Sequence, residues 1–201
     1  MDMVTESPYN KHGHNQIKIC VSGSADLSFL GPDTIEKAKE LGREIARQGA
    51  VIVTGATTGF PFWAAVGAKE IGGISIGFSP AASEKEHVEV YKLPLDYMDL
   101  IVYTGFGYPG RDLLLTRSSD AVIFGCGRIG TIHEFTIAFE DYKPIGVFEG
   151  PWEMGGQLKE IIEKGHRLND RIIFSGTEKD VVFQVIEMVK KVKVFEEQKV
   201  K

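Results

Sequence analysis

The sequence of 201 residues contains little cysteine and no long apolar run. Its two cysteines, Cys20 and Cys126, lie in an apolar segment and in a glycine-rich turn, so neither a disulfide framework nor a metal-ligand cluster is expected. The first sixteen residues are polar, and no apolar segment approaches the length that spans a membrane. These absences predict a cytoplasmic protein that has no signal peptide, no membrane contact and no metal site.

Positive charge is also in short supply. The chain has 23 Lys and Arg against 28 Asp and Glu, which gives a formal net charge of −5. Nucleic-acid-binding domains usually carry a basic face, so this balance argues against a nucleic-acid partner, although it allows a locally basic pocket. The length fits one domain with a sizeable core. We expect a flexible leader over 1–16, a single domain over 17–191 and a frayed tail over 192–201.

Short, solid apolar runs alternate with helical periodicity along the chain. Seven such runs are expected to form strands: IKICVSGS, AVIVTG, ISIGFS, LIVY, DAVIFG, PIGVFE and RIIF. Solid apolar strands that alternate with helices indicate a parallel sheet with both faces covered. The predicted fold is therefore α/β: a Rossmann-like doubly wound sheet, mostly parallel, of about seven strands with helices on both faces.

Cap residues predict where two of the helices begin. Asp33 with Glu36 forms a possible capping box at the start of the first helix, and Thr177 with Asp180 resembles another cap pair at the start of the last. The last helix is predicted to end at about Lys191. The stretch 80–99 is expected to be irregular.

Glycine is abundant, with 23 residues, and three glycine-rich turns follow the first, second and fifth predicted strands. In a parallel sheet these turns share the carboxyl edge, where such folds bind ligands. Glycines let the backbone approach a ligand, and the amides at a helix N-terminus favour a phosphate. For the glycines alone, a tight turn without a ligand is the alternative. The candidate phosphate-binding residues are Gly23, Ser24, Gly55, Thr58, Gly59, Gly127, Arg128, Ile129, Gly130 and Thr131.

Arg111 and Glu134 are the candidate catalytic residues. Arg111 begins the helix after the fourth strand, from where its guanidinium could clamp a phosphate at the sheet edge; a solvated helix arginine is the alternative. Glu134 lies three residues after Thr131, in the first turn of a helix. Those two residues could equally form a capping box.

The spacing of these residues resembles a known family. The segment GRDLLLTRSSDAVIFGCGRIGTIHE is similar to the core of the LOG-type phosphoribohydrolases, also called "possible lysine decarboxylases", whose pattern is an Arg-Lys pair, a strand and PGGxGTxxE. Two earlier segments, ICVSGSAD and VTGATTGFPFWAAVGAKEIGGISIGFSP, look like the first two turns of the family and the elements around them. The resemblance covers roughly residues 17 to 190 and places the chain in the SLOG Rossmann-like superfamily.

The resemblance implies hydrolysis of the N-glycosidic bond of a nucleoside 5′-monophosphate, which releases free base and ribose 5-phosphate. Arg111 and Glu134 would be the catalytic pair, and the glycine turn would hold the phosphate of this nucleoside-like small molecule. The resemblance also implies a homodimer or a higher homo-oligomer, and no cofactor. Lysine decarboxylation is rejected, because it needs a pyridoxal-phosphate lysine and no lysine lies in the predicted site.

The chain departs from the family pattern at three places. Asp112 stands for the Lys of the Arg-Lys pair, residues 126–128 stand for Pro-Gly-Gly, and His133 stands for the first of two paired acids. Arg128 could offset the charge of Asp112. These departures suggest a divergent branch, with relatives of molybdenum-cofactor carriers and of DprA proteins. A non-catalytic carrier or sensor of a nucleotide or molybdopterin-type ligand is therefore the alternative function.

Two further side chains have two interpretations each. His133 could be a general acid or a packed or solvated residue of the first helical turn. Cys126 could be a nucleophile, but an inert turn thiol is favoured because no histidine stands beside it in the sequence.

Overall fold

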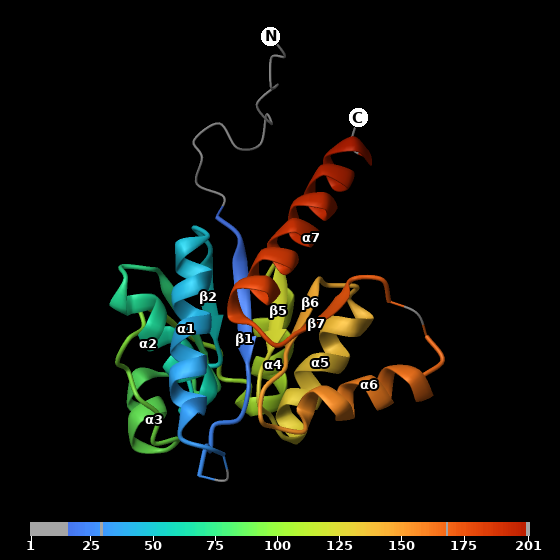
Figure 1. Ribbon diagram of the computed structural model, residues 1–201. Helices are drawn as coiled ribbons and strands as arrows, with labels where there is room; N and C mark the ends of the chain where they lie inside the picture. Colours follow the sequence, from blue (N-terminus) through green and yellow to red (C-terminus); the bar gives the residue numbers. More distant parts are fainter. Residues whose placement is uncertain (1–15, 29, 168, 200–201) are drawn as a thin grey trace.

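A seven-stranded sheet forms the centre of the protein (Figure 1). The computed structural model describes residues 16–28, 30–167 and 169–199. The strands are β1 (Lys18–Ser22), β2 (Val51–Thr54), β3 (Ser75–Ser79), β4 (Leu100–Tyr103), β5 (Ala121–Phe124), β6 (Ile145–Phe148) and β7 (Ile172–Ser175). They lie in the order β4-β3-β2-β1-β5-β6-β7, and each neighbouring pair is parallel. The predicted parallel sheet of seven strands is confirmed.

Helices cover both faces of this sheet. In the described part of the chain they are α1 (Asp33–Arg47), α2 (Phe60–Glu70), α3 (Glu84–Glu89), α4 (Gly107–Ser118), α5 (Ile129–Glu140), α6 (Met154–Lys164) and α7 (Glu178–Lys199). Buried side chains of α1, α2 and α7 share one apolar cluster with the sheet, and those of α4, α5 and α6 share the other. The doubly wound α/β fold is therefore confirmed.

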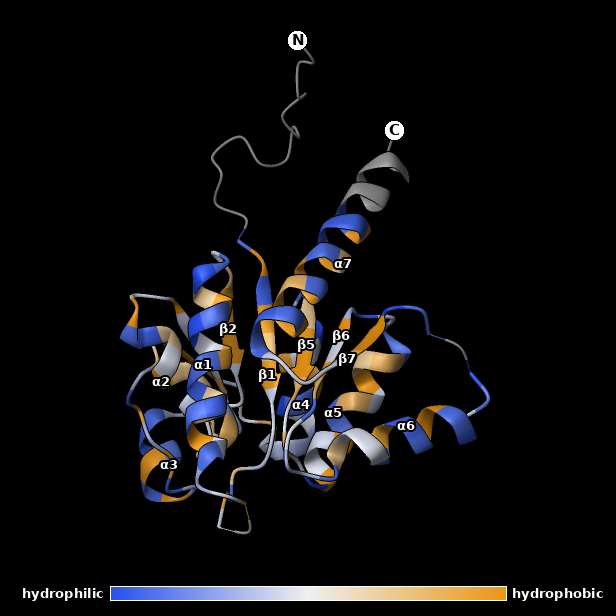
Figure 2. Cartoon of the chain, in the orientation of Figure 1, coloured by the Kyte–Doolittle hydropathy of each residue, from blue (hydrophilic) through white to orange (hydrophobic). Residues whose placement is uncertain are grey.

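The strands belong to both apolar clusters because successive side chains of a strand point to opposite faces. Ile19 and Val21 of β1 lie in the cluster of α1, α2 and α7, while Cys20 between them lies in the cluster of α4, α5 and α6. Figure 2 shows these strands as the most hydrophobic part of the chain. Burying an aliphatic side chain of this size contributes about 1.5–3 kcal/mol, so this two-sided burial is a main source of stability.

The helices α1 and α2 approach one another through glycines. A β-carbon added to Gly42 would lie 1.8 Å from the carbonyl oxygen of Ala64, and one added to Gly67 would lie 1.9 Å from that of Lys39. The two helix backbones are therefore in direct contact. Any larger residue at either position would push α1 away from α2.

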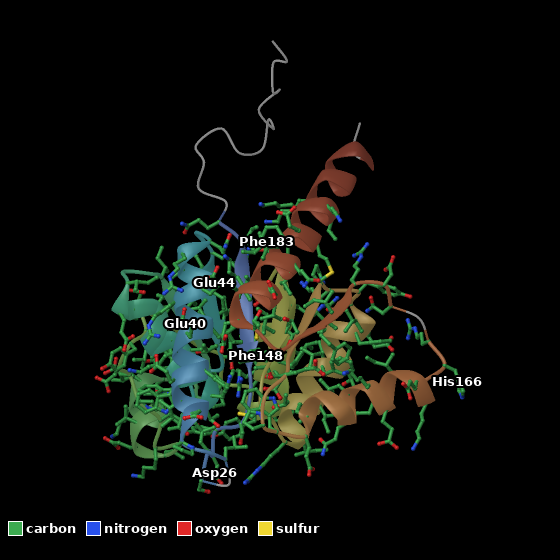
Figure 3. All side chains as sticks on the ribbon, in the orientation of Figure 1. Asp26, Glu40, Glu44, Phe148, His166 and Phe183 are labelled. Carbon is green, nitrogen blue, oxygen red and sulfur yellow. The ribbon has the colours of Figure 1, made fainter. Side chains whose placement is uncertain are left out.

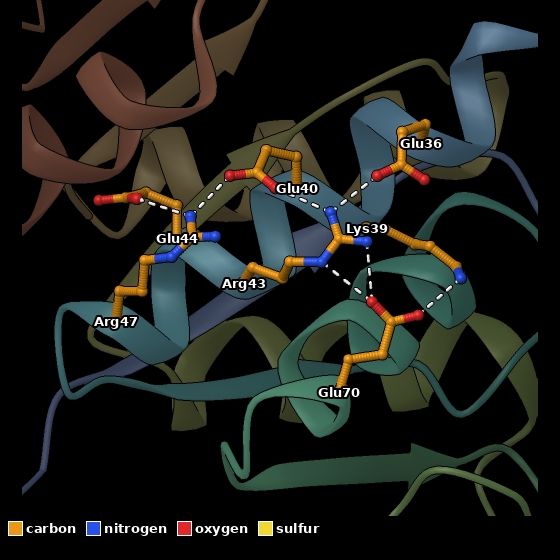
Figure 4. A network of polar contacts seen from close by, with 7 residues as sticks. All are labelled: Glu36, Lys39, Glu40, Arg43, Glu44, Arg47 and Glu70. Atoms are coloured by element: carbon orange, nitrogen blue, oxygen red, sulfur yellow. Dashed lines mark hydrogen bonds and ion pairs between the residues drawn. The ribbon is translucent and has the colours of Figure 1, made fainter.

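An exposed network of charged side chains joins the same two helices (Figure 4). Arg43 is its centre: its guanidinium contacts the carboxylates of Glu36, Glu40 and Glu70 at 2.7–2.8 Å. Lys39 Nζ lies 2.6 Å from Glu70, which links α1 to α2 a second time. We call this set the α1–α2 charge network; its members are Glu36, Lys39, Glu40, Arg43, Glu44, Arg47 and Glu70.

The two predicted helix caps have different outcomes. The capping box at α1 is wrong: the cap residue is Pro32, and no side chain caps the helix. Asp33 is already its first helical residue. The cap pair at α7 is confirmed, since Thr177 Oγ1 donates to Asp180 Oδ2 at 2.7 Å and accepts from the backbone amide of Asp180 at 3.3 Å.

Two helix boundaries also differ from the prediction. The stretch 80–99 contains α3, which begins after Ser83, whose hydroxyl accepts a hydrogen bond from the amide of Glu86. The helix α7 continues to Lys199, past Lys191, where we predicted its end. Lys, Glu and Gln have good intrinsic helix propensity, so a charged segment can extend an exposed helix. Of the predicted leader, residues 1–15 lie outside the described residues.

Candidate functional site

The candidate site lies where the winding of the sheet reverses. The strands β1 and β5 are neighbours at the centre, but the chain leaves β1 toward β2 on one side and β5 toward β6 on the other. In parallel sheets a crevice opens at the carboxyl ends of such a strand pair. A cavity of about 280 Å³ lies there. Asp26, labelled in Figure 3 at the lower edge of the molecule, lies in the turn after β1 and is part of its lining.

Most of the predicted site residues meet at this cavity. Those that line it are Gly23, Ser24, Gly55, Arg111, Arg128, Gly130, Thr131 and Glu134. The remaining four do not line it: Thr58, Gly59, Gly127 and Ile129. The structure therefore brings the three turns and Arg111 to one place, as the sequence predicted.

Hydrogen bonds hold the first turn between the other two. The amide of Ser24 donates to the carbonyl of Cys126 at 2.8 Å, and the carbonyl of Ser24 accepts from the amide of Phe60 at 2.9 Å. The Thr58 hydroxyl donates to the carbonyl of Ala25 at 2.9 Å. The second turn thus fastens the first turn in place. Thr58 thus has a structural role, although the sequence analysis named it as a candidate phosphate-binding residue.

Two glycines of the second turn are required for close approach. Gly59 has a φ of 76°, and a β-carbon on it would lie 2.1 Å from the carbonyl oxygen of Ser24. A β-carbon on Gly55 would lie 2.0 Å from Nη1 of Arg111. Gly55 therefore makes room for the guanidinium of Arg111 beside the backbone. This glycine serves the catalytic candidate directly.

The N-terminus of α5 forms one side of the cavity. Its cap residue is Arg128, in extended conformation, and no side chain caps the helix. Gly130 and Thr131 of its first turn line the cavity, and a β-carbon on Gly130 would have no atom within 4 Å. The positive end of this twelve-residue helix thus faces the cavity with its amides uncapped by a side chain. The first amide of α2, that of Phe60, is instead bonded to Ser24.

Arg111 and Glu134 are in contact at the bottom of the cavity. Arg111 Nη1 lies 3.3 Å from Glu134 Oε1 and 3.3 Å from Asp112 Oδ1. The second carboxylate oxygen of Glu134 accepts a hydrogen bond from Ser22, the last residue of β1. The capping-box alternative is wrong, because Thr131 lies inside the helix and Glu134 turns to the sheet.

Both catalytic candidates are buried: their side chains are 7% (Arg111) and 9% (Glu134) exposed. Burial raises the pKa of Glu134 to about 7, and the neighbouring Asp112 carboxylate adds to that rise. Arg111 and the Ser22 hydroxyl act in the opposite direction. Among the described residues, Nε of Arg111 has no hydrogen-bond partner although it is buried. A buried donor of this kind is costly unless a ligand or water satisfies it.

Two of the departures from the family pattern contact each other. Nδ1 of His133 lies 2.9 Å from Oδ2 of Asp112, across the contact between α4 and α5. The Asp112 side chain is 8% exposed, and that of His133 is 45% exposed. The carboxylate of Asp112 therefore has two partners, the guanidinium of Arg111 and the imidazole of His133. Arg128, which we predicted would offset Asp112, lies with Nη2 at 3.1 Å from Asp26 Oδ2.

Cys126 is buried and does not line the cavity. Burial raises the pKa of its thiol to about 11, which disfavours the thiolate that a nucleophile needs. In the described part of the chain, no group of three or more His, Cys, Asp or Glu side chains could hold a metal ion. None of the described helices is long and apolar enough to cross a membrane.

Sequence reasoning missed several residues of the cavity wall, among them the polar residues Ser22, Asp26 and Tyr108. Ser22 was one of them, although a polar residue at the end of an apolar strand is a usable signal. Asp26 and Tyr108 also line the cavity, and Tyr108 places its ring 5.7 Å from the guanidinium carbon of Arg111. Turn residues such as these carry no periodicity that would have marked them.

A family model of the SLOG cluster4 family matches residues 16–182, which includes the sheet and the whole cavity. The chain belongs to the SLOG cluster4 family. This finding confirms the superfamily that the LOG-like motif indicated. The fold, the reversal point and the glycine turns described above are thus those of an SLOG cluster4 protein.

Solved structures of other proteins share this fold. TM1055 has a TM-score of 0.72 and 24% identity, with 86% of this chain and 99% of that chain covered. The molybdenum cofactor carrier protein of Chlamydomonas reinhardtii has a TM-score of 0.67 and 25% identity, with 88% and 99% covered. DNA processing protein A of Helicobacter pylori, which binds single-stranded DNA, has a TM-score of 0.61 and 20% identity, with 86% and 81% covered. The predicted kinship to carrier and DprA proteins is confirmed at the level of fold.

Proposed function

We propose that this protein hydrolyses the N-glycosidic bond of a nucleoside 5′-monophosphate. Water replaces the base at the anomeric carbon, so that the products are the free base and ribose 5-phosphate. The observation that carries the proposal is Glu134, buried beside Arg111 and Ser22 at the bottom of the cavity, with a pKa raised to about 7. A general base or acid acts best when its pKa is near the working pH.

The phosphate is proposed to bind at the N-terminus of α5. Gly130 and Thr131 line the cavity there, and Arg128 adds a guanidinium at its rim. Binding the phosphate at this end fixes the sugar relative to Glu134, and such remote binding energy orients the reacting carbon. The volume of about 280 Å³ lies just below the range of ligand pockets, roughly 300–1,000 Å³, and suits a small ligand.

In the reaction, Glu134 is proposed to act on the sugar side. Departure of the base leaves oxocarbenium-like positive charge on the ribose, which a carboxylate stabilises. The same carboxylate can position the attacking water and take its proton; the departing base keeps the electron pair of the broken C–N bond and receives that proton. Arg111 holds the carboxylate, and its buried Nε offers an additional donor. Tyr108 lies on the wall beside Arg111, where its ring is available to a planar base.

The test is direct. The purified protein is incubated with a panel of nucleoside 5′-monophosphates, and free base is measured by chromatography, with Glu134→Ala and Arg111→Ala as controls. Base release that both variants lose supports the proposal and names the base. No release from any member of the panel contradicts it.

A second candidate is a carrier or sensor that binds without turnover. It is favoured by the 25% identity to the Chlamydomonas reinhardtii carrier and by Asp112, which puts a second carboxylate beside Glu134. A monophosphate or pterin that raises the melting temperature, with no base released, would select this function. The cavity volume of about 280 Å³ and the net charge of −5 favour a small molecule over single-stranded DNA for either candidate.

We also propose a homodimer or a higher homo-oligomer. Large apolar side chains of α4, Leu113 and Leu114, are 43% and 37% exposed, and Phe106 before the helix is 69% exposed. Contact with a second copy would remove this surface from water. Size-exclusion chromatography with light scattering tests the proposal; a single 22.2 kDa species contradicts it.

A further inference from the structure

Polar contacts connect the surface of the protein to Glu134. His133, half-exposed on α5, contacts Asp112 Oδ2 at 2.9 Å. The other oxygen of Asp112 lies 3.3 Å from Arg111 Nη1, which is also 3.3 Å from Glu134. We call this set the site network; its members are Ser22, Arg111, Asp112, His133 and Glu134. Its exposed end is a histidine, a side chain whose imidazole can take up a proton.

The charges of the site network do not balance without a proton. Two buried carboxylates, Asp112 and Glu134, share the single guanidinium of Arg111. The groups facing Glu134 from β1 are neutral: the Ser22 hydroxyl and the Cys20 thiol, whose pKa burial raises well above its usual value. One further proton, on Glu134 or on His133, makes the set neutral. Buried sites of low polarity strongly favour such neutrality.

We propose that His133, acting through Asp112, sets the pH at which Glu134 gives up its proton. This inference rests on the proposed function for its role in turnover. When His133 is protonated, it matches the charge of Asp112 and leaves Arg111 to Glu134, which then ionises. When His133 is neutral, Arg111 is divided between the two carboxylates and Glu134 keeps its proton. His133 is thus a positioning residue: it takes no part in bond breaking, and its charge prepares the carboxylate.

The pairing also explains two departures from the family pattern at once. Where the LOG-type pattern has a Lys and an acid, this chain has Asp112 and His133. In this chain the two residues contact each other, and the signs of charge at the two positions are exchanged relative to the pattern. Compared with the pattern, the permanent positive charge beside Arg111 is lost. The positive member of the pair is now His133, which is positive only when protonated and lies at the more exposed of the two positions.

The experiment follows the carboxyl carbon of Glu134 by ¹³C NMR during a pH titration of the full-length protein. The Glu134 signal is assigned by its loss in Glu134→Gln. In His133→Gln the titration midpoint rises by roughly 0.5–1 pH unit, because Glu134 loses a nearby positive charge. In Asp112→Asn it falls, because a negative charge is removed. His166→Gln, two residues after the end of α6 (Figure 3), is the matched control and leaves the midpoint unchanged.

A double variant decides whether the effect passes through Asp112. In Asp112→Asn, His133 has lost its anionic partner, so adding His133→Gln is expected to cause no further shift. An unchanged midpoint in His133→Gln overturns the proposal, as does the same shift in both backgrounds. If Asp112→Asn does not fold, the single His133→Gln variant still decides the first question.

The titration does not depend on turnover, so the two proposals can fail separately. Absence of base release contradicts the proposed function and leaves the NMR result standing. If base is released, the acid limb of kcat/KM shifts to higher pH in His133→Gln together with the NMR midpoint, while kcat at high pH is retained. An acid limb that stays in place while the midpoint shifts contradicts the role of His133 in turnover.

Discussion

The α1–α2 charge network and the site network both pair arginine with carboxylates, but they differ in their exposure to solvent. On the surface, Arg43 meets three carboxylates at 2.7–2.8 Å, and Lys39 and Arg47 supply further positive charge. In the site, the one guanidinium of Arg111 serves two carboxylates at 3.3 Å. Each network has one more carboxylate than permanent cations, but the surface network is open to solvent, whereas Arg111, Asp112 and Glu134 of the site network are buried.

The difference is visible in the pKa values of the carboxyl groups. Hydrogen bonds from Arg47 and Arg43 lower the pKa of Glu40, and those from Lys39 and Arg43 lower that of Glu70. Burial raises the pKa of Glu134 even though Arg111 lies beside it. Exposed ion pairs are solvated and cost little to form, while a buried pair must first lose its water. Contact with an arginine therefore does not by itself tell whether a glutamate is ionised.

The sharpest way to test this contrast is to remove one carboxylate charge from each network. Glu134→Gln is expected to reduce base release at least about 1,000-fold, a loss of roughly 4 kcal/mol of transition-state stabilisation. Glu70→Gln, the matched surface variant, keeps full activity. Initial rates at saturating substrate measure both. Equal activity of the two variants would show that the buried carboxylate has no special role.

The same two variants should also differ in how their stability depends on pH. The folded pKa of Glu134, about 7, is above its ordinary value of 4.5. The contribution of Glu134 to the free energy of unfolding is therefore fully present below pH 4.5 and is lost as pH rises through 7. Between pH 4.5 and pH 8 the free energy of unfolding of Glu134→Gln should gain roughly 2–3 kcal/mol relative to the parent protein. Urea titrations at both pH values measure the gain.

For Glu70 the sign is reversed. Its folded pKa is lowered, so its contribution is present above the ordinary value and is lost as pH falls through the folded value. Glu70→Gln should therefore approach the stability of the parent protein at acid pH. If both variants responded to pH with the same sign, the contrast between the two networks would be contradicted.

A smaller effect is expected from Gly55→Ala, which displaces a guanidinium without removing a charge. The added methyl would lie 2.0 Å from Nη1 of Arg111, so the side chain must move away from Glu134. We expect kcat/KM to fall roughly 30-fold, about 2 kcal/mol. Gly156→Ala in α6, where nothing lies within 4 Å of the added carbon, is the control and keeps its activity. Comparable losses of kcat/KM in the two variants would show that the effect of Gly55→Ala does not come from displacing Arg111.

The smallest effect is expected at the centre of the surface network. Arg43→Gln removes contacts to three carboxylates, yet it should lower the free energy of unfolding by no more than about 1 kcal/mol and leave activity unchanged. The loss should shrink at 1 M salt, because exposed charges are screened. Thermal unfolding at low and high salt measures it. A loss of several kcal/mol that is the same at low and high salt would mean that this network behaves like a buried one.

Much of the fold was predictable because the strands are solid apolar runs. The order of strands and helices follows from periodicity, and the site at the carboxyl edge follows from parallel pairing. The helix α3 was not predictable in this way: its six residues are too few to show a period, and Ser83 was the only local signal. The capping box at Asp33 failed because the helix begins one residue earlier than predicted, so that Pro32 is the cap residue and Asp33 is already helical.

The sequence predicted which residues of single turns and of the motif belong to the site, but not the contacts that form between separate elements. The motif gave the register of Arg111 and Glu134, which meet as expected. The contact of Asp112 with His133 joins residues 21 positions apart on two helices, and only the packing of α4 on α5 creates it. The use of the Thr58 hydroxyl to hold the first turn depends on the neighbouring strand in the same way. The local sequence shows which side chains are present, but the partner of each side chain depends on tertiary packing.

The pairing of β1 with β5 affects how the protein can be made. Lys18 and Asp120, at the start of that pair, are 102 positions apart, so a chain emerging from the ribosome has β1 through β4 available long before β5. Until then one edge of β1 lacks its partner, and an open apolar strand edge invites wrong pairing. The cavity cannot exist before this edge closes. A ligand that binds there therefore recognises only chains whose synthesis has passed Glu134, and it stabilises them over shorter ones.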